Sequence, residues 1–256
     1  MGSPRVFVIV NTDHGTMLAN RMDYQIGPDG RSAVGVGFQL LDHGQFDGAE
    51  VIQAIRILKW RHDLHGPGVV AIDGGANVGV HTVEWAKYLH GRGRVIAFEP
   101  QEMIYYALCG NITIANAFNV TAHHAALDAR AGQMAIPLPN YLAPGNFGGL
   151  QLKAPTQDIG QDIRSTSAVK VMTVDDLNLD RLDLLKLDVE GMELGAIAGA
   201  ADTIKRCRPV ILAEAIRCGR HALREALEGH GYRCSDAGVN VVAIHKDDPA
   251  PPEGIV

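Results

Sequence analysis

The stretch Val69-Val70-Ala71-Ile72-Asp73-Gly74-Gly75-Ala76-Asn77-Val78-Gly79 decides the fold of this chain. Residues 69–72 are uniformly apolar, which is typical of a strand buried on both faces of a parallel sheet. A glycine-rich turn follows, and a helical pattern then runs over residues 80–89. A strand, a glycine-rich turn and a helix in this order predict a ligand-binding unit. Glycines let the backbone approach a ligand, and the helix N-terminus offers free N–H groups.

The alternation of strand and helix continues after this turn. Further strands are expected at residues 94–98, 120–126, 182–187 and 209–213, alternating with helices at about 101–115, 192–206 and 220–230. Two strand-like stretches at 232–235 and 239–245, joined by a glycine-containing turn, predict a closing hairpin. This pattern is typical of a doubly wound α/β sheet, which binds ligands at the carboxyl ends of its strands.

The main domain is expected to span residues 69–248. Three segments do not follow its alternation of strand and helix: residues 1–68, an insertion at about 128–170, and residues 249–256. Residues 1–68 are expected to form an N-terminal cap, in which the pattern Asp47-Gly48-Ala49-Glu50 resembles a capping box and predicts the start of an amphipathic helix. We expect this cap to pack beside or over the sheet, and a dimerisation arm in a homo-oligomer is the alternative. The proline-rich residues 249–256 are expected to form a flexible tail.

A long insertion at about residues 128–170 interrupts the alternation, because prolines and glycines are frequent there. Loops of this length inside a compact domain are usually functional. The segment Asn146-Phe147-Gly148-Gly149 is the candidate lid, with glycines as hinges and Phe147 closing over the ligands.

Bulk composition excludes several classes of protein. Apolar residues make up 46% of the 256 residues, so a large core is expected. The net charge of −6 argues against nucleic-acid binding, which needs a basic face. The four cysteines show no metal or disulfide spacing, which favours free thiols in a reducing compartment. No apolar run is long enough for a signal peptide or a membrane span, so we expect a cytoplasmic protein.

The residues around the turn indicate which ligand it holds. Asp73 is unfavourable beside a pyrophosphate but suits a cofactor that carries an ammonium and a sulfonium group, as S-adenosylmethionine does. Glu99-Pro100 ends the next expected strand, where a carboxylate accepts both ribose hydroxyls; NAD enzymes use an acid there too, so an NAD(P)-dependent oxidoreductase remains the alternative. The other expected cofactor contacts are Gly75, Asn77, Gly79, His81, Thr82, Ala126 and Asp188, with Ala126 at the adenine.

Three stretches together resemble the FkbM family of methyltransferases. They are residues 70–79, Ala97-Phe98-Glu99-Pro100 and Leu185-Lys186-Leu187-Asp188-Val189-Glu190-Gly191-Met192-Glu193, and the likeness covers about residues 69–216. The resemblance implies a class I methyltransferase fold, which is Rossmann-like with a seven-stranded sheet and a C-terminal antiparallel hairpin. It also implies O-methylation of a hydroxyl on a sugar, glycolipid, polyketide or related metabolite.

An alcohol needs a base when it attacks a methyl group, because it must lose its proton. Asp188, Glu190 and Glu214 follow strand ends and are the candidate catalytic acids; helix capping, a helix dipole and an ion pair are their structural alternatives. His14, in a loop after the first expected strand, is a fourth candidate. We expect no catalytic metal, because the third ligand position of catechol-type enzymes holds Ala215. A non-catalytic nucleotide-binding protein is the remaining alternative.

Overall fold

The computed structural model, which describes residues 5–27, 29–153 and 159–255, contains a seven-stranded sheet. Its strands are β5 (Val69–Gly74), β6 (Gly93–Phe98), β7 (Val120–His123), β11 (Leu184–Leu187), β12 (Val210–Glu214), β13 (Tyr232–Ala237) and β14 (Asn240–His245), in the order β13-β14-β12-β11-β5-β6-β7. From β12 to β7 the neighbours are parallel, whereas β14 is antiparallel to both β12 and β13. The predicted doubly wound sheet with a C-terminal antiparallel hairpin is confirmed.

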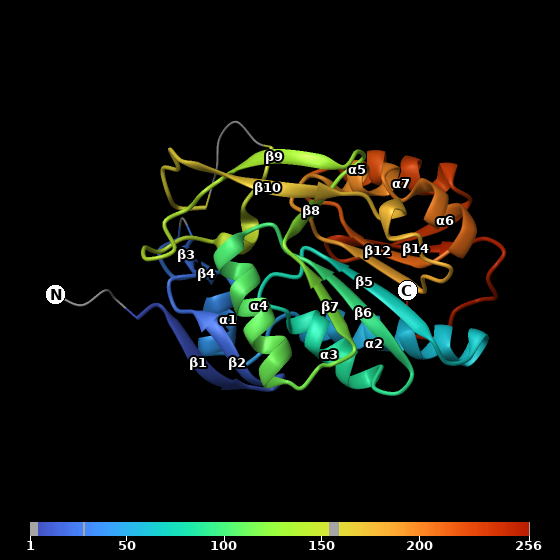
Figure 1. Cartoon of the computed structure of the whole chain (residues 1–256), viewed down its shortest axis with the longest axis horizontal. Coiled ribbons are helices and arrows are strands. Elements are labelled where there is room, and N and C mark those ends of the chain that lie inside the picture. The colour runs from blue at the N-terminus through green and yellow to red at the C-terminus, as the bar shows by residue number, and fades with distance from the viewer. Residues whose placement is uncertain (1–4, 28, 154–158, 256) are drawn as a thin grey trace.

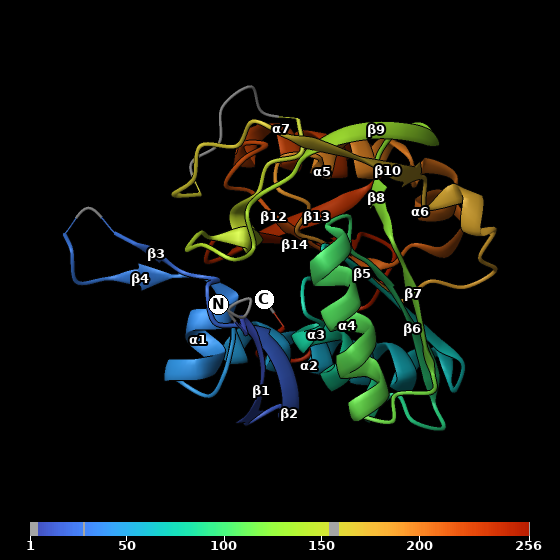
Figure 2. The same cartoon turned by 60° about the vertical axis from the view of Figure 1, so that its left-hand side comes forward.

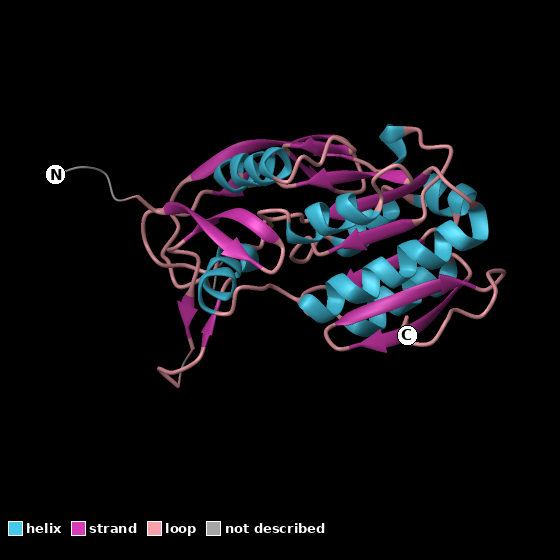
Figure 3. Cartoon of the chain, turned by 90° about the horizontal axis from the view of Figure 1, so that it is seen from below, coloured by secondary structure: helices cyan, strands magenta, loops and turns pink. Residues whose placement is uncertain are grey.

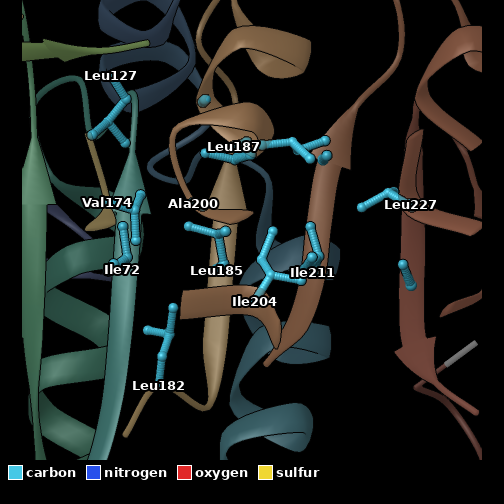
Figure 4. Packing of buried hydrophobic residues seen from close by; sticks show 14 of the residues in the cluster. Ile72, Leu127, Val174, Leu182, Leu185, Leu187, Ala200, Ile204, Ile211 and Leu227 are labelled. Atoms are coloured by element: carbon cyan, nitrogen blue, oxygen red, sulfur yellow. The ribbon is translucent and has the colours of Figure 1, made fainter. Parts of the chain in front are cut away.

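Helices cover both faces of the sheet (Figure 1). One face packs against α5 (Glu193–Ala198), α6 (Ala201–Cys207) and α7 (Arg220–Gly229), and the other packs against α2 (Gly48–His65) and α3 (Val80–Tyr88). Alternate residues of β5 divide between the two faces, because side chains of a strand alternate in direction. Ile72 packs toward the first group of helices, together with Leu185 and Ile211 (Figure 4), and Ala71 packs toward the second. Figure 3 shows the same layers by secondary structure.

The N-terminal segment is folded against this sheet domain. It contains the hairpin of β1 (Phe7–Thr12) and β2 (Gly15–Asn20), the short pair β3 (Gln25–Ile26) and β4 (Ala33–Val34), and helices α1 (Val36–Asp42) and α2. Asn111 of α4 (Glu102–Ile114) accepts from the N–H of Leu18 and donates to its carbonyl, which ties β2 to the domain. The β3–β4 pair projects from the body (Figure 2).

The insertion is more regular than the proline and glycine content predicts. The strands β9 (Gly132–Pro137) and β10 (Thr166–Met172) pair antiparallel, and β10 also pairs with β8 (Ala125–Leu127), so a second sheet forms in the order β8-β10-β9. Long-range pairing of this kind leaves no local signal between residues 128 and 170. The strand expected at 120–126 is divided at His124 into β7 and β8. Between β9 and β10 lies the one-turn helix η1 (Phe147–Gly149), and η2 (Asp175–Leu177) follows β10.

The C-terminal segment differs from the flexible tail that its prolines predict. Ile255 is buried, and its carbonyl accepts a hydrogen bond of 2.8 Å from Gln53 of α2. Arg61 of the same helix pairs with Asp248 at 2.9 Å. The tail is therefore packed along α2. In the described parts of the chain, no helix is long and apolar enough to cross a membrane.

Candidate functional site

A cavity of about 530 Å³ lies at the carboxyl ends of the parallel strands, between the sheet and the N-terminal segment. This volume is in the range of small-molecule sites. The sequence-predicted residues that line it are Gly75, Asn77, Gly79, His81, Glu99, Pro100, Ala126, Asp188, Glu190 and Glu214. The carboxyl-end rule therefore brings most of the predicted site to one place.

The glycine-rich turn passes very close to the end of β11. Gly75 has a φ of +76°, and a Cβ atom there would lie 1.7 Å from the carbonyl oxygen of Asp188. A side chain at residue 75 would both strain the backbone and displace Asp188. Glycine at this position thus keeps the turn and the candidate acid in contact.

Glu99 directly follows the last residue of β6, as expected, and lies on the cavity wall with its side chain buried. Its two carboxylate oxygens accept backbone hydrogen bonds of 2.9 Å from Asn77 and 2.8 Å from Gln101. Burial raises the pKa of Glu99 to about 7, although these hydrogen bonds oppose the shift. Glu99 is therefore a carboxylate that is held in place at the cavity wall. Its contact with ribose stays a prediction.

Asp73 does not line the cavity, which corrects the expectation that it contacts the ligand directly. Its side chain is completely buried, and Thr82 Oγ1 donates to Asp73 Oδ2 at 2.5 Å. The other oxygen, Oδ1, has no hydrogen bond within the described parts of the chain and lies 3.6 Å from Lys186 Nζ. Thr82 is thereby also occupied away from the cavity. Asp73 and Lys186 are direct neighbours in the register of β5 and β11, and this pairing between strands is what the sequence does not reveal.

Lys186 is a functional candidate that the sequence reading missed. The side chain lines the cavity, is 4% exposed, and has its Nζ 3.5 Å from Asp188 Oδ2. Burial lowers the pKa of Lys186, but the charges of Asp188, Asp73 and Glu50 outweigh this effect and raise it above its usual range. A lysine between Leu185 and Leu187 in an otherwise apolar strand was the available signal. Lys186 is a charged group that links the glycine-rich turn to the candidate acids.

Three acids at the ends of β11 and β12, Asp188, Glu190 and Glu214, form what we call the carboxylate triad. One oxygen of each lies within 4.8 Å of the others. Burial and the charge of Asp188 raise the pKa of Glu190 to about 7 and that of Glu214 to about 8. Arg217 Nε lies 3.3 Å from Glu190 Oε2 and partly offsets this shift. The spacing also suits a metal ion, so the expectation of a metal-free reaction stays a prediction.

The structure does not bring His14 to the cavity. Its Nε2 accepts a 3.1 Å hydrogen bond from the backbone N–H of Phe46, and its Nδ1 lies 3.5 Å from Glu84. Both ring nitrogens therefore serve the packing of the N-terminal segment. The early position of His14 in the chain gave no indication of this partner on α3.

The predicted lid is also corrected. Phe147 is completely buried in a core cluster with residues of α1 and α4, and its N–H donates to Asp23 Oδ1 while its carbonyl accepts from Gln101. A residue held in this way is not poised to swing over a ligand. Its neighbours Gly148 and Gly149 do line the cavity, so the segment forms a fixed wall.

The capping box predicted at the start of α2 is wrong. Asp47 has a left-handed backbone with φ 45°, its side chain makes no capping hydrogen bond, and it lines the cavity. Glu50 accepts a 2.7 Å hydrogen bond from Asn240 and lies 3.7 Å from His81 Nε2. His81 in turn lies against Trp85, with ring centroids 5.6 Å apart. The N-terminal segment therefore contributes acids to the site.

The strand order, the closing hairpin and the cavity beside the glycine-rich turn define a class I methyltransferase fold. Residues 73–234 match the family model of the methyltransferase FkbM domain, and the chain belongs to this family. The family assignment disfavours the oxidoreductase alternative.

Two curated relatives and one solved structure are similar to the chain. Methyltransferase 1 of Beauveria bassiana (strain ARSEF 2860) is 28% identical over 51% of this chain and 58% of its own length. Methyltransferase sdnD of Sordaria araneosa is 29% identical over 50% of this chain and 59% of its own length. The structure of an FkbM methyltransferase from Methylobacillus flagellatus KT has a TM-score of 0.49 and 18% identity over 75% of this chain and 48% of that one. The chain spans about half to three fifths of these proteins.

Proposed function

We propose that this protein transfers the methyl group of S-adenosylmethionine to a hydroxyl group of a small-molecule acceptor such as a sugar, a glycolipid or a polyketide. The observation that carries the proposal is the carboxylate triad, which faces the same cavity as the glycine-rich turn. Methyl transfer to an alcohol requires a base at the acceptor, and this arrangement offers carboxylates beside a cofactor cradle.

The cavity residues fit this cofactor. Gly75 lets the turn lie against the backbone of Asp188, Glu99 offers a fixed carboxylate for ribose hydroxyls, and Ala126 belongs to an apolar wall suited to adenine. When bound, S-adenosylmethionine supplies an electrophilic methyl group. The protein must hold the acceptor oxygen in line with that group and exclude water.

Proton removal falls to the carboxylate triad. A catalytic base works best with a pKa near the working pH, and the raised pKa values of Glu190 and Glu214 meet this condition. Asp188 raises both values by its charge and lies next to Lys186, which supports a role in orienting the acceptor hydroxyl. Glu190 and Glu214 are the candidate bases.

The test is release of S-adenosylhomocysteine and methyl incorporation across a panel of sugar, glycolipid and polyketide hydroxyls. We expect Asp188→Asn and Glu214→Gln to lower kcat by about a hundredfold or more while the affinity for S-adenosylhomocysteine changes little. Glu102→Gln is the matched control, because Glu102 is exposed on α4 and bonds Tyr106. Methyl incorporation at nitrogen or carbon would contradict the hydroxyl acceptor. Cofactor binding without turnover on any acceptor would favour the non-catalytic alternative.

A further inference from the structure

Two carboxylates of the N-terminal segment lie at the start of α2, one on the cavity wall and one beside His81. Asp47 lines the cavity, and Glu50 follows in the first turn of α2 with a side chain 19% exposed. Asn240 Nδ2 of β14 donates to Glu50 Oε2 at 2.7 Å, which fixes this carboxylate. Its other oxygen, Oε1, is directed at His81 Nε2.

Among the described residues, the imidazole Nε2 of His81 has no hydrogen-bond partner. Its side chain is 6% exposed and lines the cavity, and within the described residues its buried Nε2 has no partner. The 3.7 Å to Glu50 Oε1 is too long for a hydrogen bond. A buried polar atom without a partner is costly, so a further polar group is expected between Glu50 and His81.

The charge around this gap identifies the kind of group that is missing. Burial and the charge of Lys186 lower the pKa of His81 well below its usual value, so the ring is neutral. The Lys186 ammonium already faces Asp73 and Asp188. Its charge also lowers the pKa of Asp47 and Glu50. Burial and the charges of neighbouring carboxylates nevertheless raise the pKa of Asp47 and Glu50. Lys186 therefore does not fully compensate the negative charge of these two acids. A cationic hydrogen-bond donor satisfies both carboxylates and the imidazole.

We propose that Asp47, Glu50 and His81 form a subsite for a primary ammonium group, and that its ligand is the α-ammonium of the cofactor's amino-acid part. This inference rests on the proposed function. Asp73, the residue expected to receive that ammonium, is occupied by Thr82 and Lys186. His81 lies in the first turn of α3, where free backbone N–H groups favour the cofactor's carboxylate. The ammonium is attached to the carbon next to that carboxylate, so it must lie close to His81 as well.

The experiment compares two ligands by calorimetry on the intact protein. One is S-adenosylhomocysteine, and the other is its analogue with a hydroxyl in place of the amino group. We expect Glu50→Gln and Asp47→Asn each to weaken binding of S-adenosylhomocysteine about tenfold or more and to leave binding of the hydroxy analogue nearly unchanged. Asp63→Asn is the matched control, because Asp63 lies on the same helix, is exposed and pairs with Lys59.

The outcomes separate this subsite from the wider proposal. Suppose that the wild-type protein binds S-adenosylhomocysteine but each variant weakens the binding of both ligands equally. Asp47 and Glu50 would then have a structural role only, and the inference would be wrong. Unchanged affinity for S-adenosylhomocysteine in both variants would also overturn it, since the ammonium would then be held elsewhere or belong to the acceptor. If the wild-type protein binds neither ligand, the proposed cofactor itself fails.

Discussion

Replacing Lys186 with methionine removes the cation that faces the completely buried carboxylate of Asp73. In the native protein the ammonium lies 3.6 Å from Asp73 Oδ1 and 3.5 Å from Asp188 Oδ2. Asp188 is 38% exposed, so water can solvate it after the substitution. Asp73 has no such access and retains the hydrogen bond from Thr82. The loss in stability therefore arises mainly at Asp73.

Breaking a buried pair by removing one partner costs about 3–5 kcal/mol, and the exposure of Asp188 favours the lower end, about 3 kcal/mol. For a chain of this size, that loss lowers Tm by about 6–12 °C. Urea unfolding followed by circular dichroism of the helices measures the change. We expect the second substitution Asp73→Asn to restore about 1–2 kcal/mol of the loss, because it removes the uncompensated charge.

Lys59→Met is the matched control, because Lys59 forms an ion pair of 2.6 Å with Asp63 on the surface of α2. Such exposed pairs contribute under about 1 kcal/mol. A Lys186→Met protein within about 1 kcal/mol of the wild type would refute the reasoning, since Asp73 would then need no cation. Equal losses in the single and double variants would show that methionine packs poorly at this position.

Four further predictions concern the residues of the cavity. The pKa values of about 7 and about 8 at Glu190 and Glu214 predict that kcat/KM rises with pH through this range, and Glu214→Gln should remove the upper part of the rise. The folded protein binds the carboxyl protons of Glu190 and Glu214 more tightly than the unfolded chain does. The free energy of unfolding should therefore fall as pH rises from about 4.5 to about 8. Urea titrations at several pH values check this. Gly75→Ala should weaken cofactor affinity more than tenfold by calorimetry, whereas Gly91→Ala, also at positive φ but in open space, should not. Methyl transfer should survive a chelator, because a lysine and an arginine already supply positive charge to the carboxylate triad; loss with EDTA and recovery with Mg²⁺ would instead make the triad a metal site.

The features that follow from local pattern were predictable. The glycine-rich turn, Glu99 and Asp188 each stand at the end of a short apolar run, and parallel strands bring their carboxyl ends to one edge. The closing hairpin was predictable for the same reason, because its two strands are adjacent in sequence. The strand order of the main sheet and the glycine-rich turn can therefore be predicted with little long-range information.

The direction of individual side chains was less predictable. Asp73 turns away from the cavity because Lys186, on a strand 113 residues later, is its register neighbour. Phe147 is buried because Asp23 and Gln101 bind its backbone from distant segments. Asp47 fits a capping pattern, but its left-handed backbone aims the carboxylate elsewhere. Each difference depends on a tertiary contact that leaves no mark on the neighbouring sequence.

The contact between the tilted rings of His81 and Trp85 places a fluorescent side chain beside the proposed ammonium subsite. The chain has two tryptophans, Trp60 and Trp85, and Trp85 is completely shielded from solvent beside the imidazole. A cation placed next to His81 changes the electric field at that indole, so the emission of Trp85 reports what occupies the neighbouring subsite. With Trp60→Phe, a single-tryptophan protein would follow ligand arrival in a stopped-flow instrument without any added dye.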